Sequence, residues 1–440
     1  MGKAVIILAR EGDFVSEQDN YSDHQRSYRF YAPRQVIGSE VLREMDQCVT
    51  APQGFRAGTI ACGIKSDLTI KDLAVLVADA PCVAAGTFTT SSTRAAPVYV
   101  CQERLQSGRA QAIIVNSGNA NCATGEQGLQ NAYRMTELVA ERWGLAKELV
   151  LCSSTGIIGR QLPMEKIEAG VKALDLGRGQ GNAFAEAIMT TDTRPKRKAL
   201  EMQIEGKTVR LGGVTKGAGM IYPNMATMLC YLTTDAAIEH TWLQSELRAA
   251  VADSFNMISV DGDMSTNDTC ILLANGLAGN TPINEQHPDA NTFRAALRSI
   301  TQYLAREMAR DGEGATRLMT VHVRGARDKA DAVKAARAIT LSPIWQCALA
   351  GGDPNWGRIV AALGASGCTL QQDNYDIFIG DVQTTAHGVA AEYDQEQARA
   401  AVAGKEVTIT IDLHLGTGQA TAWGCDLTHG YIDENSLYTR

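Results

Sequence analysis

The stretch KGAGMIYPNMATMLCYLTTD, residues 216–235, is a glycine-rich loop that runs directly into an apolar segment. The apolar part, TMLCYLT, is predicted to be a buried strand, because it is short and bounded by polar residues. Thr227 stands where the loop meets this strand, and the small residue Ala226 precedes it. A strand that opens with a hydroxyl group is a rigid mount for a nucleophile.

Thr227 would gain its own base if the chain were cut just before it. The new α-amine would lie beside the hydroxyl, and an α-amine has a pKa of about 7.7–8.0, so it can accept the hydroxyl proton near neutral pH. An acyl shift of the Ala226 carbonyl onto the threonine oxygen can make the cut, because Ala226 is small and the preceding loop is rich in glycine. The alternative is that Thr227 is an ordinary strand residue.

Two further stretches carry side chains suited to acyl chemistry. STGIIG follows the apolar run LVLC, so the Thr155 hydroxyl and the Gly156 backbone N–H can form an oxyanion hole where a strand ends. In RDGEGAT, Glu313 stands between two glycines and is suited to a substrate ammonium. Taken singly, a glycine turn and a helix C-cap loop explain these two stretches equally well.

Composition excludes several other classes of function. The chain of 440 residues has a net charge of -8 and no run of Lys or Arg, so nucleic acid is not expected as a partner. Its 11 cysteines are scattered without a C-x-x-C pair, which favours reduced thiols in a cytoplasmic protein over disulfides or a zinc site. The N-terminal apolar stretch AVIILA is too short for a membrane span.

The pattern of strands and helices predicts a layered α+β fold. QAIIVNSG and ELVLCSSTG are predicted strands, EVTITIDLHLGTG alternates as a half-buried strand, and two helices are marked by apolar residues at helical spacing. These helical positions are Ile238, Leu243, Leu247, Val251 and Phe255, and then Phe293, Leu297, Ile300, Leu304 and Met308. Residues 1–48 are polar and non-periodic, as in an N-terminal extension.

Twelve motifs in order give the chain a resemblance to a known family. They are APQGF, FTT, AAPV, NSGNAN, STGIIG, AIMTTD, KGAGMIYPNMATML, SFNMISVDGD, STND, DGEGAT, DPNWGR and WGCDLT. From about Val49 to its C-terminus the chain resembles the ornithine acetyltransferase (glutamate N-acetyltransferase) family of arginine biosynthesis. The resemblance implies a layered αββα sandwich of the type found in self-processing aminopeptidases, without a cofactor or a metal.

The resemblance also implies a cut between Ala226 and Thr227. The products are an α chain, residues 49–226, and a β chain, residues 227–440, which stay associated as a dimer of αβ units. The residues with implied roles are Thr227 as nucleophile and acetyl carrier, Thr155 and Gly156 as the oxyanion hole, and Thr190, Lys216, Thr227, Glu313 and Asn435 as substrate contacts. Lys216 suits an α-carboxylate and Glu313 suits the distal ammonium of ornithine.

The implied reaction moves an acetyl group from N2-acetylornithine to glutamate in a ping-pong cycle, with acetyl-CoA as a further candidate donor. Three alternatives stay open: the same machinery serving another N-acyl amine, an amidohydrolase in which water accepts the acyl group, and an uncleaved paralogue that only binds. Trp345, Gln346 and Arg440 stand where the family usually has other residues. These departures leave the identity of the donor and the acceptor open.

Overall fold

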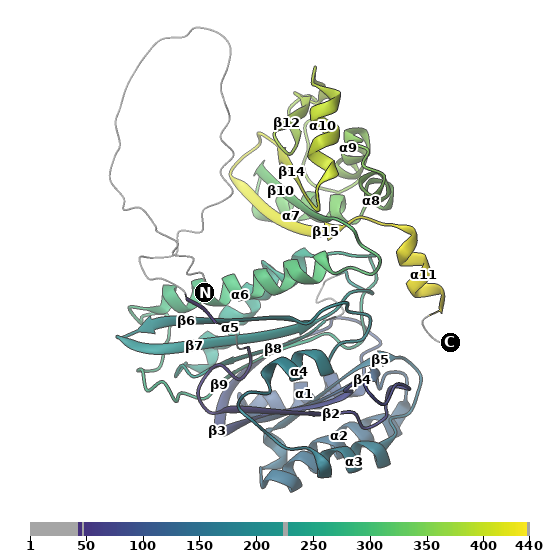
Figure 1. Cartoon of the computed structure of the whole chain (residues 1–440). Coiled ribbons are helices and arrows are strands. Elements are labelled where there is room, and N and C mark those ends of the chain that lie inside the picture. The colour runs from purple at the N-terminus through teal and green to yellow at the C-terminus, as the bar shows by residue number, and fades with distance from the viewer. Residues whose placement is uncertain (1–42, 46–47, 223–227, 438–440) are drawn as a thin grey trace, which may run out of the picture.

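The structure is a computed structural model that describes residues 43–45, 48–222 and 228–437. Ala226, Thr227 and Arg440 lie outside the described residues. The described chain forms two sheets flanked by helices, with the larger sheet in the lower part of Figure 1 and the smaller one above it.

The larger sheet has nine strands in the order β1-β6-β7-β8-β9-β3-β4-β5, with β2 paired to β3. Its strands are β1 Arg43–Met45, β2 Phe55–Ile60, β3 Leu73–Phe88, β4 Arg109–Asn119, β5 Val150–Ile157, β6 Lys196–Ile204, β7 Lys207–Lys216, β8 Leu229–Thr234 and β9 Thr269–Ala274. Because β1 pairs with β6, the sheet begins inside the segment that the sequence marks as an N-terminal extension.

The long strand β3 joins the two halves of this sheet. Its first part, residues 73–78, pairs with β2 and β4, and its second part, residues 83–88, pairs with β9. The register against β4 shifts between Val77 and Cys82. A bulge of this kind bends a strand and increases its twist, so the two halves of the sheet can face one another.

Alternating residues of these strands bury both faces of each half. Leu229 and Tyr231 of β8 enter the same inner core cluster as Ile113 and Val115 of β4, whereas their neighbours in sequence face the opposite way. The inner cluster therefore lies between β6–β9 on one side and β2–β5 on the other.

A strand buried on both faces is apolar without interruption, as the sequence TMLCYLT indicated. The strand is nevertheless shorter at its start than predicted, because β8 begins at Leu229 and Met228 lies outside it.

Helices cover the two outer faces, which completes the predicted αββα sandwich. In Figure 1, α6 lies over β6 and β7, while α2 and α3 lie beyond β3 and β4 on the opposite side. The helices of this part are α1 Ala96–Arg104, α2 Gly125–Trp143, α3 Met164–Ala173, α4 Gly181–Ala187, α5 His240–Ala252 and α6 Ala290–Arg310. Short 3-10 turns occupy Leu105–Ser107, Lys147–Leu149 and Phe255–Met257.

The predicted helix around residues 238–255 is shorter than its apolar spacing indicated. Ile238 forms an isolated bridge with Ile283, and Phe255 lies in the 3-10 turn after α5. Both side chains are buried in the same core cluster as α5. Ile238 and Phe255 are buried beside α5 and continue its apolar spacing, although neither belongs to the helix.

The smaller sheet has the order β13-β12-β11-β14-β10-β15, with β10 parallel to β14. Its elements are β10 Leu318–Ala326, α7 Lys329–Thr340, α8 Pro343–Ala350, α9 Trp356–Gly364, β11 Asp376–Ile379, β12 Val382–Ala386, β13 Val389–Ala390, α10 Gln395–Ala403, β14 Glu406–Asp412 and β15 Gly418–Cys425, followed by α11 His429–Leu437. One core cluster runs from α5 and α6 into β10, β14 and α7, so the two sheets share an apolar interior.

The strands on either side of the loop 217–228 are hydrogen-bonded neighbours. β7 pairs antiparallel with β8, with Lys216 opposite Leu229, and β8 pairs parallel with β9. A chain cut within this loop would keep both of its pieces in one sheet.

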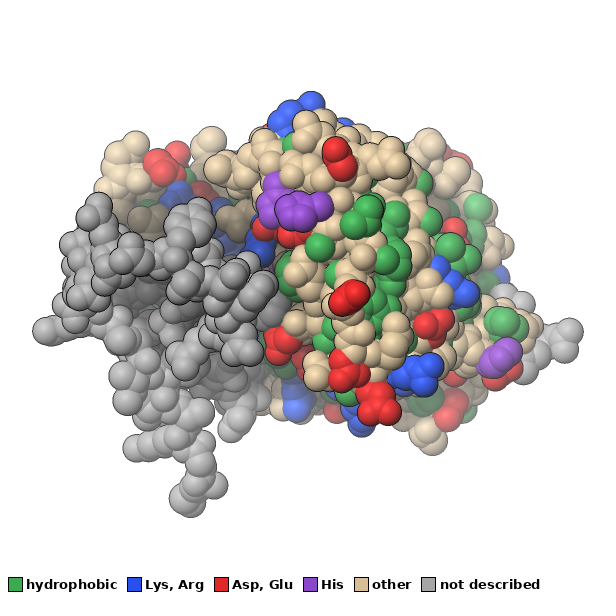
Figure 2. Space-filling view, turned by 90° about the horizontal axis from the view of Figure 1, so that it is seen from above, with side chains coloured by type: hydrophobic (Ala, Val, Ile, Leu, Met, Phe, Trp, Pro, Cys, Tyr) green, Lys and Arg blue, Asp and Glu red, His purple; other side chains and the backbone are tan. Residues whose placement is uncertain are grey.

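The described surface carries charges of both signs. Acidic and basic side chains are interspersed on the face shown in Figure 2. Among the described helices, none combines the length and the apolar character that a membrane crossing requires. The described residues also contain no cluster of His, Cys, Asp or Glu arranged to hold a metal ion.

Tyr231 tests the inner core cluster. It is fully buried and meets Phe184 edge to face, with ring centroids 5.6 Å apart. We expect Tyr231→Ala to lower the free energy of unfolding by about 3–5 kcal/mol, because it leaves a cavity between the two halves of the sheet. Urea titration measures this loss.

Tyr231→Phe is the matched control. The Tyr231 hydroxyl is buried and makes no hydrogen bond to any described residue, so its removal should change the free energy of unfolding by less than about 1 kcal/mol. Equal losses in both variants would contradict this account of the core.

Candidate active site

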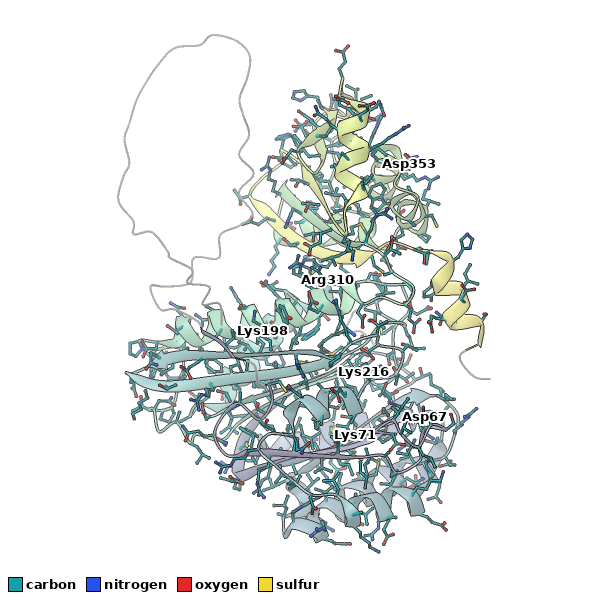
Figure 3. The ribbon with its side chains drawn as sticks, viewed as in Figure 1. Asp67, Lys71, Lys198, Lys216, Arg310 and Asp353 are labelled. Atoms are coloured by element: carbon teal, nitrogen blue, oxygen red, sulfur yellow. The ribbon has the colours of Figure 1, made fainter. Side chains whose placement is uncertain are left out.

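Lys216 brings together three of the residues singled out from the sequence. It is the last residue of β7, and its side chain is almost fully buried in the middle of the molecule (Figure 3). Its Nζ donates to the Thr190 hydroxyl at 2.7 Å and to the Thr155 hydroxyl at 3.3 Å. Thr155 lies near the end of β5, so the strand ends place these groups from distant parts of the chain in one site.

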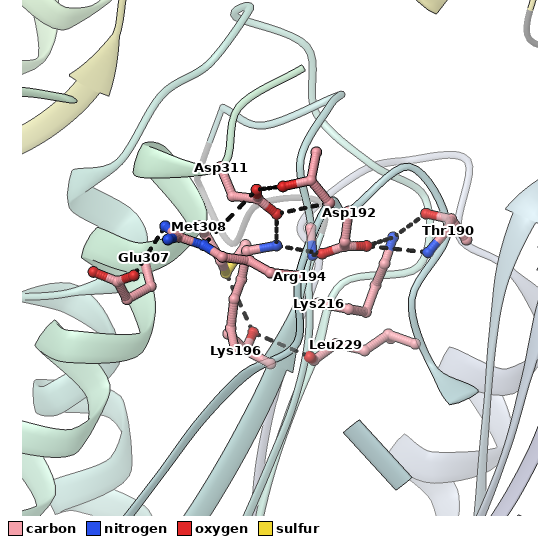
Figure 4. A network of polar contacts seen from close by, with 12 residues as sticks. Thr190, Asp192, Arg194, Lys196, Lys216, Leu229, Glu307, Met308 and Asp311 are labelled. Carbon is pink, nitrogen blue, oxygen red and sulfur yellow. Dashed lines mark hydrogen bonds and ion pairs between the residues drawn. The ribbon is translucent and has the colours of Figure 1, made fainter. Parts of the chain in front are cut away.

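Asp192 is the carboxylate that holds this cluster together (Figure 4). It accepts hydrogen bonds from Lys196 Nζ at 2.6 Å, from the Gly217 N–H at 2.7 Å and from the Thr190 N–H at 3.0 Å. Lys216 Nζ lies 3.9 Å from its other side, and the Asp192 side chain is fully buried. A buried charge of this kind requires such partners.

The network continues away from the site through Asp311, just after α6. Lys196 Nζ also donates to Asp311 Oδ2 at 2.5 Å, and Asp311 accepts from the Thr193 backbone N–H at 3.1 Å and from its hydroxyl. Arg194 extends the chain of charges to Glu307 at 3.0 Å. The network thus ties the end of α6 to the segment that carries Thr190.

Burial and charge act in opposite directions on these groups. Burial raises the pKa of Asp192, but Lys196, Lys216 and the hydrogen bonds outweigh it and hold that pKa far below its usual value. Burial lowers the pKa of Lys216, with Lys196 adding to the effect, while Asp192, Glu313 and Asp268 raise it. The net effect lowers the pKa of Lys216, and a substrate carboxylate beside it would favour its charged form.

The turn at Thr155 and Gly156 depends on a close backbone approach. Gly156 has a φ of +132°, and a Cβ at this position would lie 2.3 Å from the Gly118 carbonyl carbon. Only glycine fits here. Ser154 Oγ donates to Asn116 Oδ1 at 2.6 Å, which fixes the strand just before Thr155.

Glu313 and Asn435 form a second part of the site. Glu313 Oε2 accepts from Asn435 Nδ2 at 2.8 Å, and the Glu313 backbone N–H donates to the Ala218 carbonyl at 2.9 Å. A Cβ on Gly219 would come within 2.2 Å of the Glu313 carboxylate. The glycine loop is therefore in direct contact with Glu313, which is buried rather than solvated.

Both described ends of the loop 217–228 are held by buried carboxylates. The Gly217 N–H donates to Asp192, and the Met228 N–H donates to Asp268 Oδ1 at 3.0 Å. Ala226 and Thr227, the predicted cleavage pair, lie outside the described residues, so their role stays a prediction.

The sequence alone did not single out three charged residues of this region. Asp192 and Asp268 stand inside the motifs AIMTTD and STND, but nothing in those letters separates a buried ion pair from a turn. Lys65 was also missed: its Nζ donates to the Met189 carbonyl at 2.8 Å, next to Thr190. The four backbone N–H groups that Asp72 accepts, from residues 62–65, hold the Lys65 loop in place.

Two of the departures from the family pattern, Trp345 and Gln346, make their hydrogen bonds outside the Lys216 cluster. Trp345 of α8 is fully buried in the core, and its Nε1 lies 2.9 Å from Met319 Sδ. Gln346 Nε2 donates to the Val260 carbonyl at 2.9 Å, behind the loop that carries Asp261. Asp353, at the start of DPNWGR, lies at the far end of the molecule from Lys216 (Figure 3).

Comparison with known proteins places these residues in a family context. The ArgJ family profile matches residues 56–440. The "Arginine biosynthesis bifunctional protein ArgJ" of Symbiobacterium thermophilum is 48% identical over 393 residues, which are 89% of this chain and 98% of that protein. The protein of the same name from Geobacillus kaustophilus is 45% identical over 403 residues, 91% of this chain and 98% of that protein.

Two solved structures are also similar in sequence. The argJ protein of Bacillus halodurans is 42% identical, with a TM-score of 0.46 over 47% of this chain and 97% of that chain. The ornithine acetyltransferase of Mycobacterium tuberculosis, solved with ornithine, is 40% identical, with a TM-score of 0.39 over 43% of this chain and 100% of that chain.

Asp192→Asn tests the buried charge network. We expect the free energy of unfolding at pH 7 to fall by about 3–5 kcal/mol, because Lys196 and Lys216 lose their shared counter-charge. The folded pKa of Asp192 lies below its unfolded value of about 3.9, so its contribution is complete above that pH and is lost as the pH falls through the folded pKa. Urea titrations at several pH values measure the free energy of unfolding of both proteins. The gap between wild type and Asp192→Asn should become smaller only under acidic conditions.

Asp67→Asn is the control, because Asp67 is an exposed loop carboxylate whose pKa is lowered by hydrogen bonds from Thr69. It should have little effect on stability. If the free energies of unfolding of wild type and Asp192→Asn differ by the same amount down to about pH 2, the role of Asp192 does not depend on its charge.

Proposed function

The chain belongs to the ArgJ family, and from this membership and the buried site we propose that it transfers an acetyl group from N2-acetylornithine to glutamate through an acetyl-Thr227 intermediate. Membership confirms the family that the motifs indicated and the predicted class of enzyme, an acyltransferase. The identity of the two substrates and the acetyl-Thr227 intermediate are what we propose.

One observation carries the proposal: the buried Lys216 ammonium lies within hydrogen-bonding distance of both the Thr155 and Thr190 hydroxyls. It stands at the start of the glycine loop that ends at Thr227. A cation in this position, partly compensated by Asp192, is suited to a substrate α-carboxylate. The acetyl group on the neighbouring α-nitrogen would then reach the region of Thr155 and Gly156.

The proposed cycle begins when Thr227 Oγ attacks the acetyl carbonyl of the donor. The hydroxyl proton passes to the Thr227 α-amine, and the oxyanion forms against the Thr155 hydroxyl and the Gly156 N–H. The bond from the carbonyl carbon to N2 of ornithine then breaks, and the same proton leaves on that nitrogen. The amine of glutamate attacks the acetyl-Thr ester in the reverse sequence of steps, which releases N-acetylglutamate.

Glu313 is placed to recognise the far end of the donor. Its carboxylate lies against the glycine loop and is oriented by Asn435. Glu313 and Lys216 have side chains of opposite charge, and Glu313 acts to raise the pKa of Lys216. Together they match ornithine, which has a carboxylate at one end and an ammonium at the other.

We further propose that the α chain, residues 49–226, and the β chain, residues 227–440, act as one unit after the cut. The pairing of β7 with β8 supports this, since each piece contributes strands to the nine-stranded sheet. A dimer of such αβ units in the cytoplasm, without a cofactor, completes the proposal. The word "bifunctional" in the names of the relatives supports a second reaction, for which we propose acetyl-CoA as acetyl donor to glutamate.

The nucleophile is tested by processing and by transfer. Purified wild type should give two fragments, the second starting Thr-Met-Leu-Cys, and should form N-acetylglutamate from N-acetylornithine only when glutamate is present. Thr227→Ala should remain a single chain and be inactive, because it lacks the hydroxyl needed for both steps. N-terminal sequencing and product analysis check this.

Two results would reject the proposal. Active wild type with an uncut chain would exclude Thr227 as an N-terminal nucleophile. Acetate release that is equal with and without glutamate would identify a hydrolase instead.

Glu313→Gln tests recognition of the donor. We expect kcat/KM for N-acetylornithine to fall at least about a hundredfold, since a buried ammonium left without its carboxylate costs several kcal/mol. N-acetylated neutral amino acids supply the internal control, and their use should change far less. Arg440→Thr, at the atypical C-terminal position, should leave the preference for N-acetylornithine over N-acetylglutamate unchanged; poor use of N-acetylornithine by wild type that Arg440→Thr rescues would contradict the assigned donor.

A further inference from the structure

Lys65 is a lysine beside the Lys216 cluster to which the proposed reaction assigns no task. Its Nζ donates to the Met189 carbonyl at 2.8 Å, and Met189 directly precedes Thr190, to which Lys216 donates (Figure 4). A lysine ammonium has three donors, and no other described residue accepts a hydrogen bond from this one. Two N–H groups of a half-buried cation are therefore left for a ligand.

The backbone that carries Lys65 is fixed to the larger sheet. The Asp72 carboxylate accepts the four N–H groups of residues 62–65 at 2.6 to 3.0 Å. The Asp72 carbonyl accepts the Ser117 N–H of β4 at 2.9 Å. β4 pairs with β5, with Ser117 opposite Thr155. Lys65 is therefore mounted on the strand next to Thr155, unlike a lysine on a free surface loop.

Two glycines allow the Lys65 side chain to lie against the turn at Gly156. A Cβ on Gly118 would lie 3.0 Å from Lys65 Cγ, and a Cβ on Gly156 would lie 2.3 Å from the Gly118 carbonyl carbon. Both glycines have a positive φ, +98° at Gly118 and +132° at Gly156. The Lys65 methylene chain, Gly118 and Gly156 are thus successive contacts. Lys65 therefore contacts the residue that lies against the proposed oxyanion turn.

The ammonium groups of Lys65 and Lys216 are separated by a length that suits a dicarboxylate. Lys216 Nζ is 2.7 Å from the Thr190 hydroxyl, and Lys65 Nζ is 2.8 Å from the Met189 carbonyl oxygen. Those two oxygens are at most about 5 Å apart, because five bonds of fixed length and a planar peptide join them. The two nitrogens therefore lie within about 11 Å of one another. Extended glutamate has carboxyl carbons about 5 Å apart, so with a hydrogen bond at each end it reaches cations up to about 12 Å apart, and its rotatable side chain also spans shorter separations.

The side-chain carboxylate of glutamate needs a cation other than Lys216. If Lys216 holds the α-carboxylate of either substrate, the side chain of ornithine ends in an ammonium and that of glutamate ends in a carboxylate. Glu313 suits the ammonium, but it repels a second carboxylate. Lys196 is already engaged, because two buried carboxylates lie 2.6 and 2.5 Å from its Nζ. Lys65 is the remaining lysine that the structure describes beside this cluster.

The charge of Lys65 is set by opposing effects. Burial lowers its pKa, Asp72 raises it, and Lys216 and Asp192 add smaller effects, downward and upward respectively. These effects start from an ordinary lysine pKa of about 10.4, more than about three units above neutral pH. A carboxylate bound to the amine raises the pKa and so favours the ammonium form. Binding of a dicarboxylate and charging of Lys65 therefore support each other.

We propose that Lys65 is a specificity residue that binds the side-chain carboxylate of glutamate while Lys216 holds the α-carboxylate. This inference rests on the proposed function. Both substrates then share one anchor, and their side chains diverge from it, ornithine toward Glu313 and glutamate toward Lys65. Lys65 keeps its hydrogen bond to Met189 and uses its remaining donors for the substrate. One site is thereby able to accept two amino acids whose side chains carry opposite charges.

Lys65→Met in the full chain tests this role, because methionine keeps an unbranched apolar chain and removes the ammonium. In a ping-pong cycle, kcat/KM for the donor reports on the first half-reaction and kcat/KM for the acceptor reports on the second. We expect kcat/KM for glutamate to fall about tenfold to a hundredfold, as a lost hydrogen bond to a charged group implies. The value for N-acetylornithine should stay at that of wild type, because its side chain is not directed to Lys65. In the reverse direction, N-acetylglutamate should lose the same factor and ornithine should not.

Three further variants separate the charge of Lys65 from its structural contact. Lys65→Gln keeps a donor for the Met189 carbonyl without the charge, so it should lose glutamate in the same way, and it replaces Lys65→Met if that variant does not fold. Lys65→Arg keeps the charge and should recover most of the loss. Lys166→Met is the matched control, because Lys166 Nζ donates to the Gly63 carbonyl of the same loop at 2.7 Å from an exposed position on α3. It should leave kcat/KM unchanged for all four substrates.

Two patterns would overturn the proposal. An equal fall in kcat/KM for all four substrates would show that Lys65 only holds the Thr190 segment in place. Unchanged values for glutamate and N-acetylglutamate in Lys65→Met and Lys65→Gln would show that the ammonium does not meet the substrate. Wild type is assayed first, because a failure to transfer acetyl between N-acetylornithine and glutamate refutes the proposed function, whereas these two patterns refute the role of Lys65 alone.

Discussion

The fully buried Asp192 carboxylate is the constraint on which the site depends. It lies between two lysines, Lys196 and Lys216; without it Lys196 would keep only Asp311 as an ion-pair partner, and Lys216 would have none among the described residues. Because it also accepts the N–H groups of Gly217 and Thr190, one side chain fixes both the start of the loop 217–228 and the segment that carries Thr190. Asp192 therefore determines both the electrostatics of the site and the position of its backbone.

The sandwich explains why such a cluster can exist. The bend in β3 brings two halves of one sheet face to face, and their apolar inner residues exclude water from the strand ends. In that environment Lys216 and Asp192 interact strongly, whereas exposed ion pairs contribute little. If the chain is cut as proposed, the pairing of β7 with β8 across the loop would keep both pieces in one sheet.

The geometry divides the site into two parts with different tasks. Lys216 and Thr155 lie at strand ends and meet Thr190 from the segment between α4 and β6, whereas Glu313 and Asn435 come from a loop and from α11. In the proposed reaction, the first part would hold the α-carboxylate and the acetyl group, which every N2-acetyl amino acid shares. The second part contacts the glycine loop through Gly219 and suits the selection of the amine.

The sequence by itself determined the family, the layered fold and most strands, because those depend on apolar runs and on ordered motifs. TMLCYLT predicted β8, although the strand begins only at Leu229, because a strand buried on both faces is apolar throughout. The sequence also pointed to Thr155, Thr190, Lys216, Glu313 and Asn435, and the structure brings the first three together and pairs the last two. It overestimated the helix around α5, since burial of Ile238 and Phe255 mimicked the helical period.

Only the tertiary structure decided which charges are buried and what they face. In the sequence, Asp192 and Asp268 resemble turn residues and Lys65 resembles a surface lysine. The type of a residue does not reveal whether its side chain is exposed to solvent. Each of these three residues forms a hydrogen bond with a residue far away in the chain. Asp192 accepts from Gly217, Asp268 accepts from Met228, and Lys65 donates to Met189. Burial and partners set the energy of a charge, and both are properties of the folded chain.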